Sequence, residues 1–217
     1  MFSERLEQLR RQIAEACQRS NRDPNDIALI AVTKYAALEA LQEAYEQGLR
    51  AFGESRIPTA LDKMAQLPSD IAWHFIGHLQ SNKVAKAIGR FALIHSIDSL
   101  DLAKKISSAS VQQNSATAIL LQVNTSGETS KQGFTPDACR AHFAELSQLP
   151  GITVQGLMTM APLTDDEKVI RTCFSRLRSL RDELKLRHLS MGMSHDFPIA
   201  IEEGATLLRI GSTLFGK

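Results

Sequence analysis

The chain has 217 residues, a formal net charge of +1 and 43% apolar residues, so it can bury one sizeable core and we expect a single domain over residues 1–217. So small a net charge gives no field that would attract nucleic acid or an anionic membrane surface. No apolar run is long enough to span a membrane and the N-terminus does not resemble a signal peptide, which predicts a cytoplasmic protein with a small ligand.

The first predicted element is an amphipathic helix from Met1 to about Arg19, where apolar residues recur at helical spacing. Eight strand-like runs follow and alternate with segments long enough to be helices. The strands are expected at 27–33, 51–53, 72–76, 91–97, 117–123, 152–158, 188–191 and 206–210. Regular alternation indicates a parallel sheet, and eight such units close most simply as an α/β (β/α)8 TIM barrel with an extra N-terminal helix. A doubly wound open sheet is the alternative.

Three familiar kinds of site are not supported by the residue patterns. The three cysteines are odd in number and far apart, which argues against a disulfide framework and a metal knuckle. His74 and His78 lie on a strand-like segment without the glutamate of a zincin helix, so we expect no metal there. The adjacent residues Ser194-His195-Asp196 cannot adopt the geometry of a hydrolase triad.

Two segments near the C-terminus have the composition of a phosphate site. Ser190–Ser194 and Arg209–Ser212 each follow a predicted strand and offer glycine, serine hydroxyls and backbone N–H groups. In a barrel these are strands seven and eight, where phosphate sites commonly form beside a short helix such as the one expected at 197–203. Each segment alone is equally compatible with a tight turn. Their shared position predicts a phosphate cup.

A lysine and an arginine extend this prediction toward pyridoxal phosphate. Lys34 ends the apolar run that begins at Ile27, and a lysine amine forms a Schiff base with the pyridoxal aldehyde. Arg209 only donates hydrogen bonds. Beside the ring nitrogen it would keep that nitrogen unprotonated, which suits storage or proton exchange better than transamination. A solvated lysine at a strand end is the ordinary alternative, and a Schiff-base aldolase acting on sugar phosphates would share both the lysine and the cup.

Several motifs in a fixed order strengthen the pyridoxal phosphate hypothesis. They are Ala31–Lys34, Phe52–Glu54, His74–Lys83, Val123–Asn124, Gly156–Pro162, Leu189–Phe197 and Arg209–Ser212. With these motifs the chain resembles the pyridoxal phosphate homeostasis protein family, the PROSC-type proteins that bind pyridoxal 5'-phosphate (PLP), which are relatives of the barrel domain of alanine racemase. The resemblance extends from about Ile30 to Gly216.

The resemblance implies roles for ten residues. Lys34 would form the Schiff base with PLP, and Arg209 would contact the ring nitrogen. The other implied contacts are Ser194, Gly211 and Ser212 at the phosphate, with Ser190 and Met193 close by, and His78, Asn124 and Met158 along the ring.

One departure from the family pattern follows Phe-Gly-Glu. Where the family usually has Asn-Tyr and then a glutamine, this chain has Ser55-Arg56-Ile57-Pro58. The shorter Ser55 is expected to lose a polar contact to the cofactor. Pro58 suits the first turn of the next helix, so we expect the fold to be retained.

A racemase of this fold removes the proton with the lysine and returns it from the opposite face with a tyrosine of a second domain. Here the chain ends at Lys217, and its tyrosines are Tyr35, next to Lys34 and so expected to face away from the pocket by strand alternation, and Tyr45, in a helix. We therefore expect a monomeric PLP-binding protein of vitamin B6 homeostasis without turnover, which exchanges PLP transiently with apo PLP-enzymes. A weak racemase or another PLP-dependent enzyme is the alternative.

Overall fold

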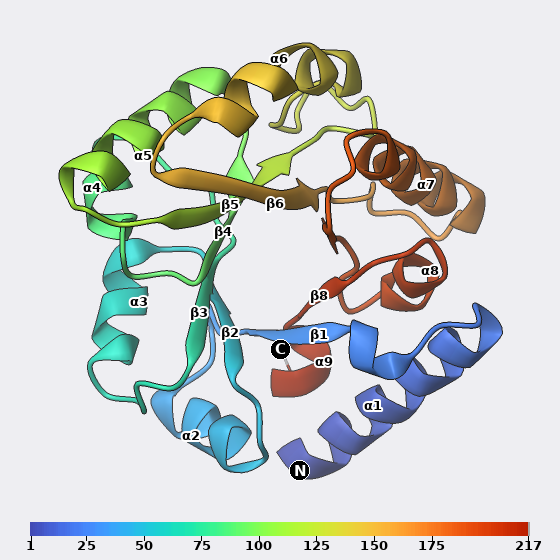
Figure 1. Ribbon diagram of the computed structural model, residues 1–217. Coiled ribbons are helices and arrows are strands. Elements are labelled where there is room, and N and C mark those ends of the chain that lie inside the picture. The colour runs from blue at the N-terminus through green and yellow to red at the C-terminus, as the bar shows by residue number, and fades with distance from the viewer. Residues whose placement is uncertain (217) are drawn as a thin grey trace.

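The computed structural model describes residues 1–216. Its eight parallel strands form a closed barrel in which each strand pairs with its neighbours in sequence and β8 pairs with β1 (Figure 1). The strands are β1 (Ala28–Val32), β2 (Ala51–Glu54), β3 (Ala72–Phe75), β4 (Leu93–Ile97), β5 (Thr117–Gln122), β6 (Ile152–Met158), β7 (His188–Ser190) and β8 (Leu207–Ile210). The expected TIM barrel is confirmed, and the open sheet is excluded because the sheet closes between β8 and β1.

Helices surround the barrel in the order of the chain (Figure 1). They are α1 (Phe2–Arg19), α2 (Leu38–Glu46), α3 (Ile57–Met64), α4 (Val84–Ala87), α5 (Leu100–Gln112), α6 (Pro136–Gln148), α7 (Glu167–Glu183), α8 (Phe197–Glu202) and α9 (Ser212–Phe215), with 3-10 turns η1 (Pro24–Asp26) and η2 (Ser81–Lys83). None of the helices within residues 1–216 combines the length and apolar composition that a membrane-spanning helix needs.

The expected N-terminal helix is confirmed as α1, and it covers the short helices at the end of the chain. Its apolar face buries Phe2, Leu6 and Leu9, and it contacts α8 and α9 (Figure 1). Because α8 and α9 are short, they leave a side of the barrel that a long amphipathic helix can cover. The two short helices that flank β8 are thereby packed against α1.

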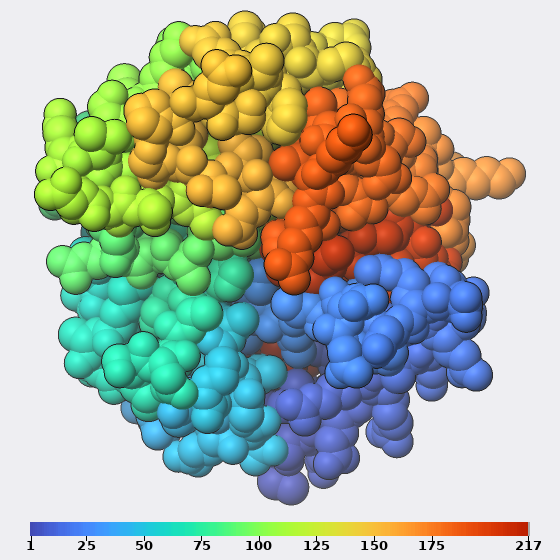
Figure 2. Space-filling model, viewed as in Figure 1, coloured from blue at the N-terminus to red at the C-terminus, as the bar shows by residue number. Residues whose placement is uncertain are grey.

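The barrel interior is filled by side chains rather than open. A small apolar cluster in the interior is formed by Ile30, Leu93, Leu120, Met158 and Leu207. Figure 2 shows atoms of several segments meeting near the centre of the face in view. The larger apolar core lies between the strands and the surrounding helices. Such packing supports loops at the strand ends, where barrel sites form.

Candidate functional site

A cavity of about 490 Å³ opens at the carboxyl ends of the strands. It receives residues from the ends of β1, β2, β3, β6, β7 and β8 or from the loops that follow them. Six of the ten predicted site residues line it: Lys34, Met193, Ser194, Arg209, Gly211 and Ser212. The lining also includes Val32, Tyr35, Ala36, Ser55, Ile76, Met160, Leu163, His195 and Phe215. The lysine, the arginine and both phosphate segments therefore meet in one place.

The turn that carries Lys34 is held by a buried ion pair. Lys63 Nζ lies 2.6 Å from Glu54 Oε1 and donates to the Thr33 carbonyl at 2.7 Å. The Thr33 hydroxyl donates to the same carboxylate oxygen at 2.6 Å. Glu54 is 1% exposed, so its charge depends on these partners. Although Glu54 belongs to a motif found in the sequence, its role and that of Lys63 were not predicted.

Tyr35 corrects one prediction from the sequence. It was expected to face away from the pocket, but β1 ends at Val32, and both Lys34 and Tyr35 lie in the turn that follows. Strand alternation therefore does not apply to them. Tyr35 lines the cavity, and Lys34 Nζ lies 4.9 Å from the centre of its ring. The phenol is thus a second ionisable group beside the lysine.

The two phosphate segments are joined by hydrogen bonds that backbone N–H groups donate. The Thr213 N–H donates to Ser194 Oγ at 3.3 Å, and the Arg209 N–H donates to the Gly192 carbonyl at 3.0 Å. Gly192 has a φ of +96°, and a Cβ there would lie 2.7 Å from Ala200 Cβ. Only glycine fits this position without strain. The cup is therefore set by the backbone rather than by its side chains alone.

Two helix starts border the cup. The first turn of α9 begins at Ser212, directly after Gly211, and backbone N–H groups of a first turn have no partner within the helix. On the other side, α8 begins after Asp196. The Met193 N–H donates to Asp196 Oδ1 at 2.6 Å. Asp196 Oδ2 accepts no hydrogen bond among the described residues and lies 3.5 Å from His195 Nε2. The cup thus offers N–H and hydroxyl donors, which are suited to an anion.

Arg209 is buried below the cup and firmly held. Its Nη1 donates to Ser190 Oγ at 2.6 Å and its Nη2 donates to the Thr159 carbonyl at 2.9 Å. Burial lowers the pKa of the guanidinium to about 10, so it remains charged at neutral pH. A fixed cation at the floor of the cavity results.

Ser190 connects Arg209 to two histidines in the barrel interior through hydrogen bonds. His95 Nδ1 lies 2.8 Å from Ser190 Oγ, and His95 Nε2 lies 2.9 Å from His74 Nδ1. Burial lowers the pKa of His74 to about 4 and that of His95 well below its usual value. Both are therefore neutral at physiological pH. His95 was not predicted as a site residue, and only its place within a mainly apolar, strand-like run could have pointed to it.

Three predicted ring contacts lie outside this cavity in the described structure. His78 is half exposed, and its Nδ1 lies 3.3 Å from Asp98 Oδ2. The amide nitrogen of Asn124 donates to two carbonyls of its own loop, within residues 124–131. Met158 is buried in the interior apolar cluster. Their contact with a cofactor stays a prediction.

The unusual Ser55 segment is accommodated by the fold. Ser55 lines the cavity, and a Cβ on Gly77 would lie 2.2 Å from its carbonyl oxygen. The close approach requires glycine at position 77 and fixes the Ser55 backbone. Pro58 lies in the first turn of α3, as expected.

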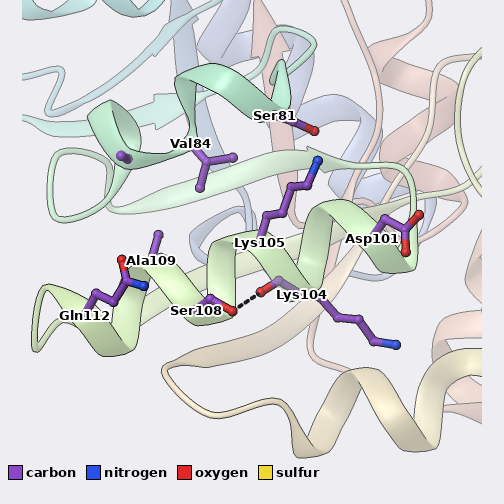
Figure 3. Close-up of a pocket in the computed structure, with 9 residues that line it drawn as sticks. Ser81, Val84, Asp101, Lys104, Lys105, Ser108, Ala109 and Gln112 are labelled. Carbon is purple, nitrogen blue, oxygen red and sulfur yellow. Dashed lines mark hydrogen bonds between the residues drawn. The ribbon is translucent and has the colours of Figure 1, made fainter.

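A separate groove lies on the outer surface between α4 and α5 (Figure 3). Ser81, Asp101, Lys104 and Lys105 are among its lining residues. Ser108 Oγ donates to the Lys104 carbonyl at 3.0 Å within α5. The groove contains none of the predicted site residues, and we assign it no role.

Comparisons with known proteins agree with the geometry. The family model "Alanine racemase, N-terminal domain" matches residues 5–217. The pyridoxal phosphate homeostasis protein of Aquifex aeolicus is 42% identical over 221 residues, covering 99% of this chain and 97% of that protein. The protein of the same name from Pseudomonas aeruginosa is 40% identical over 218 residues, covering 99% and 95%.

Solved structures give the same relationship. PipY of Synechococcus elongatus PCC7942, in the structure with PLP bound, is 38% identical, covers 100% of both chains and has a TM-score of 0.87. An alanine racemase from Clostridium difficile 630 has a TM-score of 0.77 at 15% identity, covering 94% of this chain and 56% of the racemase. The racemase shares the fold alone.

Proposed function

The chain belongs to the pyridoxal phosphate homeostasis protein family, and we propose that it binds PLP in the cavity at the barrel mouth and serves PLP homeostasis. One observation carries this proposal: Lys34, Arg209 and both phosphate segments line the same cavity. A relative of 38% identity binds PLP within the same fold. The cavity therefore brings together the groups that PLP binding needs.

The chemistry of the lining fits an anionic cofactor. It contains the cations of Lys34 and Arg209, several hydroxyls and backbone N–H groups, and none of its described residues is Asp or Glu. The volume of about 490 Å³ lies within the range of small-molecule sites. Ser194, Gly211 and Ser212 would hold the phosphate dianion, with Met193 beside them.

Covalent chemistry is supplied by the cofactor, whose aldehyde condenses with a lysine amine to form a C=N bond with loss of one water. Lys34 is the lysine of the lining, so we assign the bond to its Nζ. The guanidinium of Arg209 can only donate. It would hold the ring nitrogen as a hydrogen-bond acceptor and so restrain electron withdrawal by the ring.

We propose binding without turnover. Racemisation through two bases needs acid–base groups on opposite faces of the substrate carbon. The ring of Tyr35 lies beside Lys34 rather than across from it, with its centre 4.9 Å from Lys34 Nζ. We further propose that the protein acts as a cytoplasmic monomer and that apo PLP-enzymes take up PLP from it transiently. A PLP-dependent racemase or related enzyme is the alternative.

The proposal is tested by titrating the purified protein with PLP and recording visible absorbance, with Lys34→Ala and the exposed control Lys86→Ala on α4. We expect a visible band in the native protein and in the control, and none in Lys34→Ala. A sugar-phosphate aldolase would lack this band as purified, whereas a PLP-binding protein is expected to carry it before any PLP is added. Transfer of the bound PLP to an apo-enzyme then tests the role in homeostasis, and recovery of that enzyme's activity measures the transfer. If the protein keeps its PLP as a stable covalent adduct would, so that the apo-enzyme does not regain activity, the role in homeostasis is contradicted.

A further inference from the structure

A continuous line of hydrogen bonds leads from the cavity floor into the barrel interior. It joins Arg209 Nη1 to Ser190 Oγ at 2.6 Å, Ser190 Oγ to His95 Nδ1 at 2.8 Å, and His95 Nε2 to His74 Nδ1 at 2.9 Å. The four residues come from β8, β7, β4 and β3. All four are buried, so water does not compete for these contacts.

Donor and acceptor roles along this line have one consistent direction. An arginine has no acceptor, so Ser190 Oγ accepts from Arg209 and its own hydroxyl proton is directed to His95 Nδ1. His95 then carries its proton on Nε2 and donates it to His74 Nδ1. His74 in turn carries its proton on Nε2. The opposite direction would leave a buried hydroxyl proton without an acceptor, which is costly.

A protonated His95 is also incompatible with the line. Both of its ring nitrogens would donate, so Nδ1 could no longer accept the Ser190 proton. It would also place a second buried cation behind Arg209. Burial of His95 and the neighbouring His74, Arg209 and His188 all disfavour a proton on His95 and lower its pKa. The neutral imidazole is therefore part of the arrangement that holds the guanidinium.

We propose that His95 is a positioning residue, which acts through Ser190 to fix the Arg209 guanidinium at the cavity floor, and that His74 sets the tautomer of His95. The inference deepens the proposed function and rests on it where it concerns PLP. Without the His95 acceptor, the Ser190 hydroxyl turns to another partner. Arg209 then keeps only the Thr159 carbonyl as its well-placed anchor.

Two amide substitutions test the contacts of the two ring nitrogens of His95 separately. In His95→Asn the side-chain amide lies near the position of Nδ1, so its oxygen can accept from Ser190. In His95→Gln the amide reaches the position of Nε2, so it can contact His74 but offers Ser190 no acceptor at the Nδ1 position. Both variants remove the ring and leave a neutral amide in the barrel. Their difference therefore reports on the contact with Ser190 rather than on loss of packing.

The first experiment uses NMR on the protein without added cofactor. We expect nitrogen resonances of His74 and His95 that identify neutral rings protonated at Nε2. We also expect separate, slowly exchanging Nη signals of Arg209 in the native protein and His95→Asn, and averaged signals in His95→Gln. A native His95 protonated at Nδ1 would overturn the proposal even if neither variant folds. Identical Arg209 signals in two folded variants would overturn it too.

The second experiment measures PLP affinity of the same proteins, with circular dichroism to verify folding. We expect His95→Asn to stay close to the native affinity and His95→Gln to bind on the order of tenfold more weakly, as for loss of a hydrogen bond to a charged group. Equal affinity of both variants and the native protein would contradict the positioning role. If the native protein itself fails to bind PLP, the proposed function fails, while the NMR result still decides the role of His95.

Discussion

The Ser194 hydroxyl accepts the backbone N–H of Thr213 at 3.3 Å. This contact joins the loop after β7 to the first turn of α9, so two segments that are separate in the sequence form one cup. The cup therefore depends on both loops, and a serine of each loop can be substituted to test it.

The double substitution Ser194→Ala and Ser212→Ala is expected to weaken PLP binding. Each hydroxyl would lose a hydrogen bond to a charged acceptor, worth on the order of tenfold in affinity. Calorimetric titration measures the change. Pyridoxal without phosphate serves as the control ligand, because its weak binding should be the same in both proteins. Equal affinity of the native protein for pyridoxal and PLP would argue against a phosphate cup.

Removing one partner of the buried ion pair should destabilise the protein. Lys63→Met leaves the carboxylate of Glu54 buried without its cation, which costs about 3–5 kcal/mol when a buried pair is broken. The double variant Lys63→Met with Glu54→Gln removes both charges and is expected to recover part of that loss. Urea unfolding gives the free energies. Unchanged stability of Lys63→Met would show that the pair does not hold the Lys34 turn.

Protonation of the interior histidines should destabilise the folded protein in acid. The pKa of His74 is lowered from 6.5 to about 4, so between these values the unfolded chain binds a proton that the folded chain does not. Stability therefore falls as the pH is lowered through this range, by up to about 1.4 kcal/mol per pH unit for this histidine. Urea unfolding from pH 7 to pH 5 measures the slope.

A matched pair of variants shows which histidine causes the dependence of the unfolding free energy on pH. His74→Asn keeps an acceptor near the Nδ1 position and should reduce the dependence on pH. His142→Asn, on the outer helix α6, removes a partly exposed histidine and should leave it nearly unchanged. If both variants have the native slope, the interior histidines do not cause the loss of stability in acid.

No racemisation of L- or D-alanine above that of free PLP is expected from the purified protein, because Tyr35 lies beside Lys34 rather than across the cavity. If Lys34 both removes and returns the α-proton, deuterium from heavy water enters with retention of configuration. Chiral chromatography with mass detection distinguishes the outcomes. Inversion that requires Lys34, far exceeds the rate of free PLP and disappears in Tyr35→Phe would establish a second base and overturn the proposal of binding without turnover.

The fold was predictable because its information is local and repeated. Eight alternating strand and helix patterns leave few ways to arrange a parallel sheet, and the structure closes them as expected. That the two predicted phosphate segments meet at one cavity was also predictable, because both follow strands seven and eight of a barrel. Their contact with a phosphate stays a prediction.

The site details that were missed depend on exact strand ends and on contacts between distant strands. Strand alternation failed for Tyr35 because β1 ends at Val32, a boundary that residue patterns do not fix. The contact of His95 with Ser190 joins residues 95 positions apart. Asn124, which the family resemblance implies at the ring, donates its amide N–H groups to carbonyls of its own loop, so its contact with the cofactor stays a prediction.

The most direct test of the account is to identify the lysine that bonds to PLP. Borohydride reduction of the protein with PLP, followed by peptide mapping, should place the pyridoxyl group on Lys34, with loss of the label in Lys34→Ala and its retention in Lys86→Ala. A pyridoxyl group found instead on Lys63, Lys83 or another lysine, or no labelled peptide at saturating PLP, would contradict the assignment of the cavity as the PLP site.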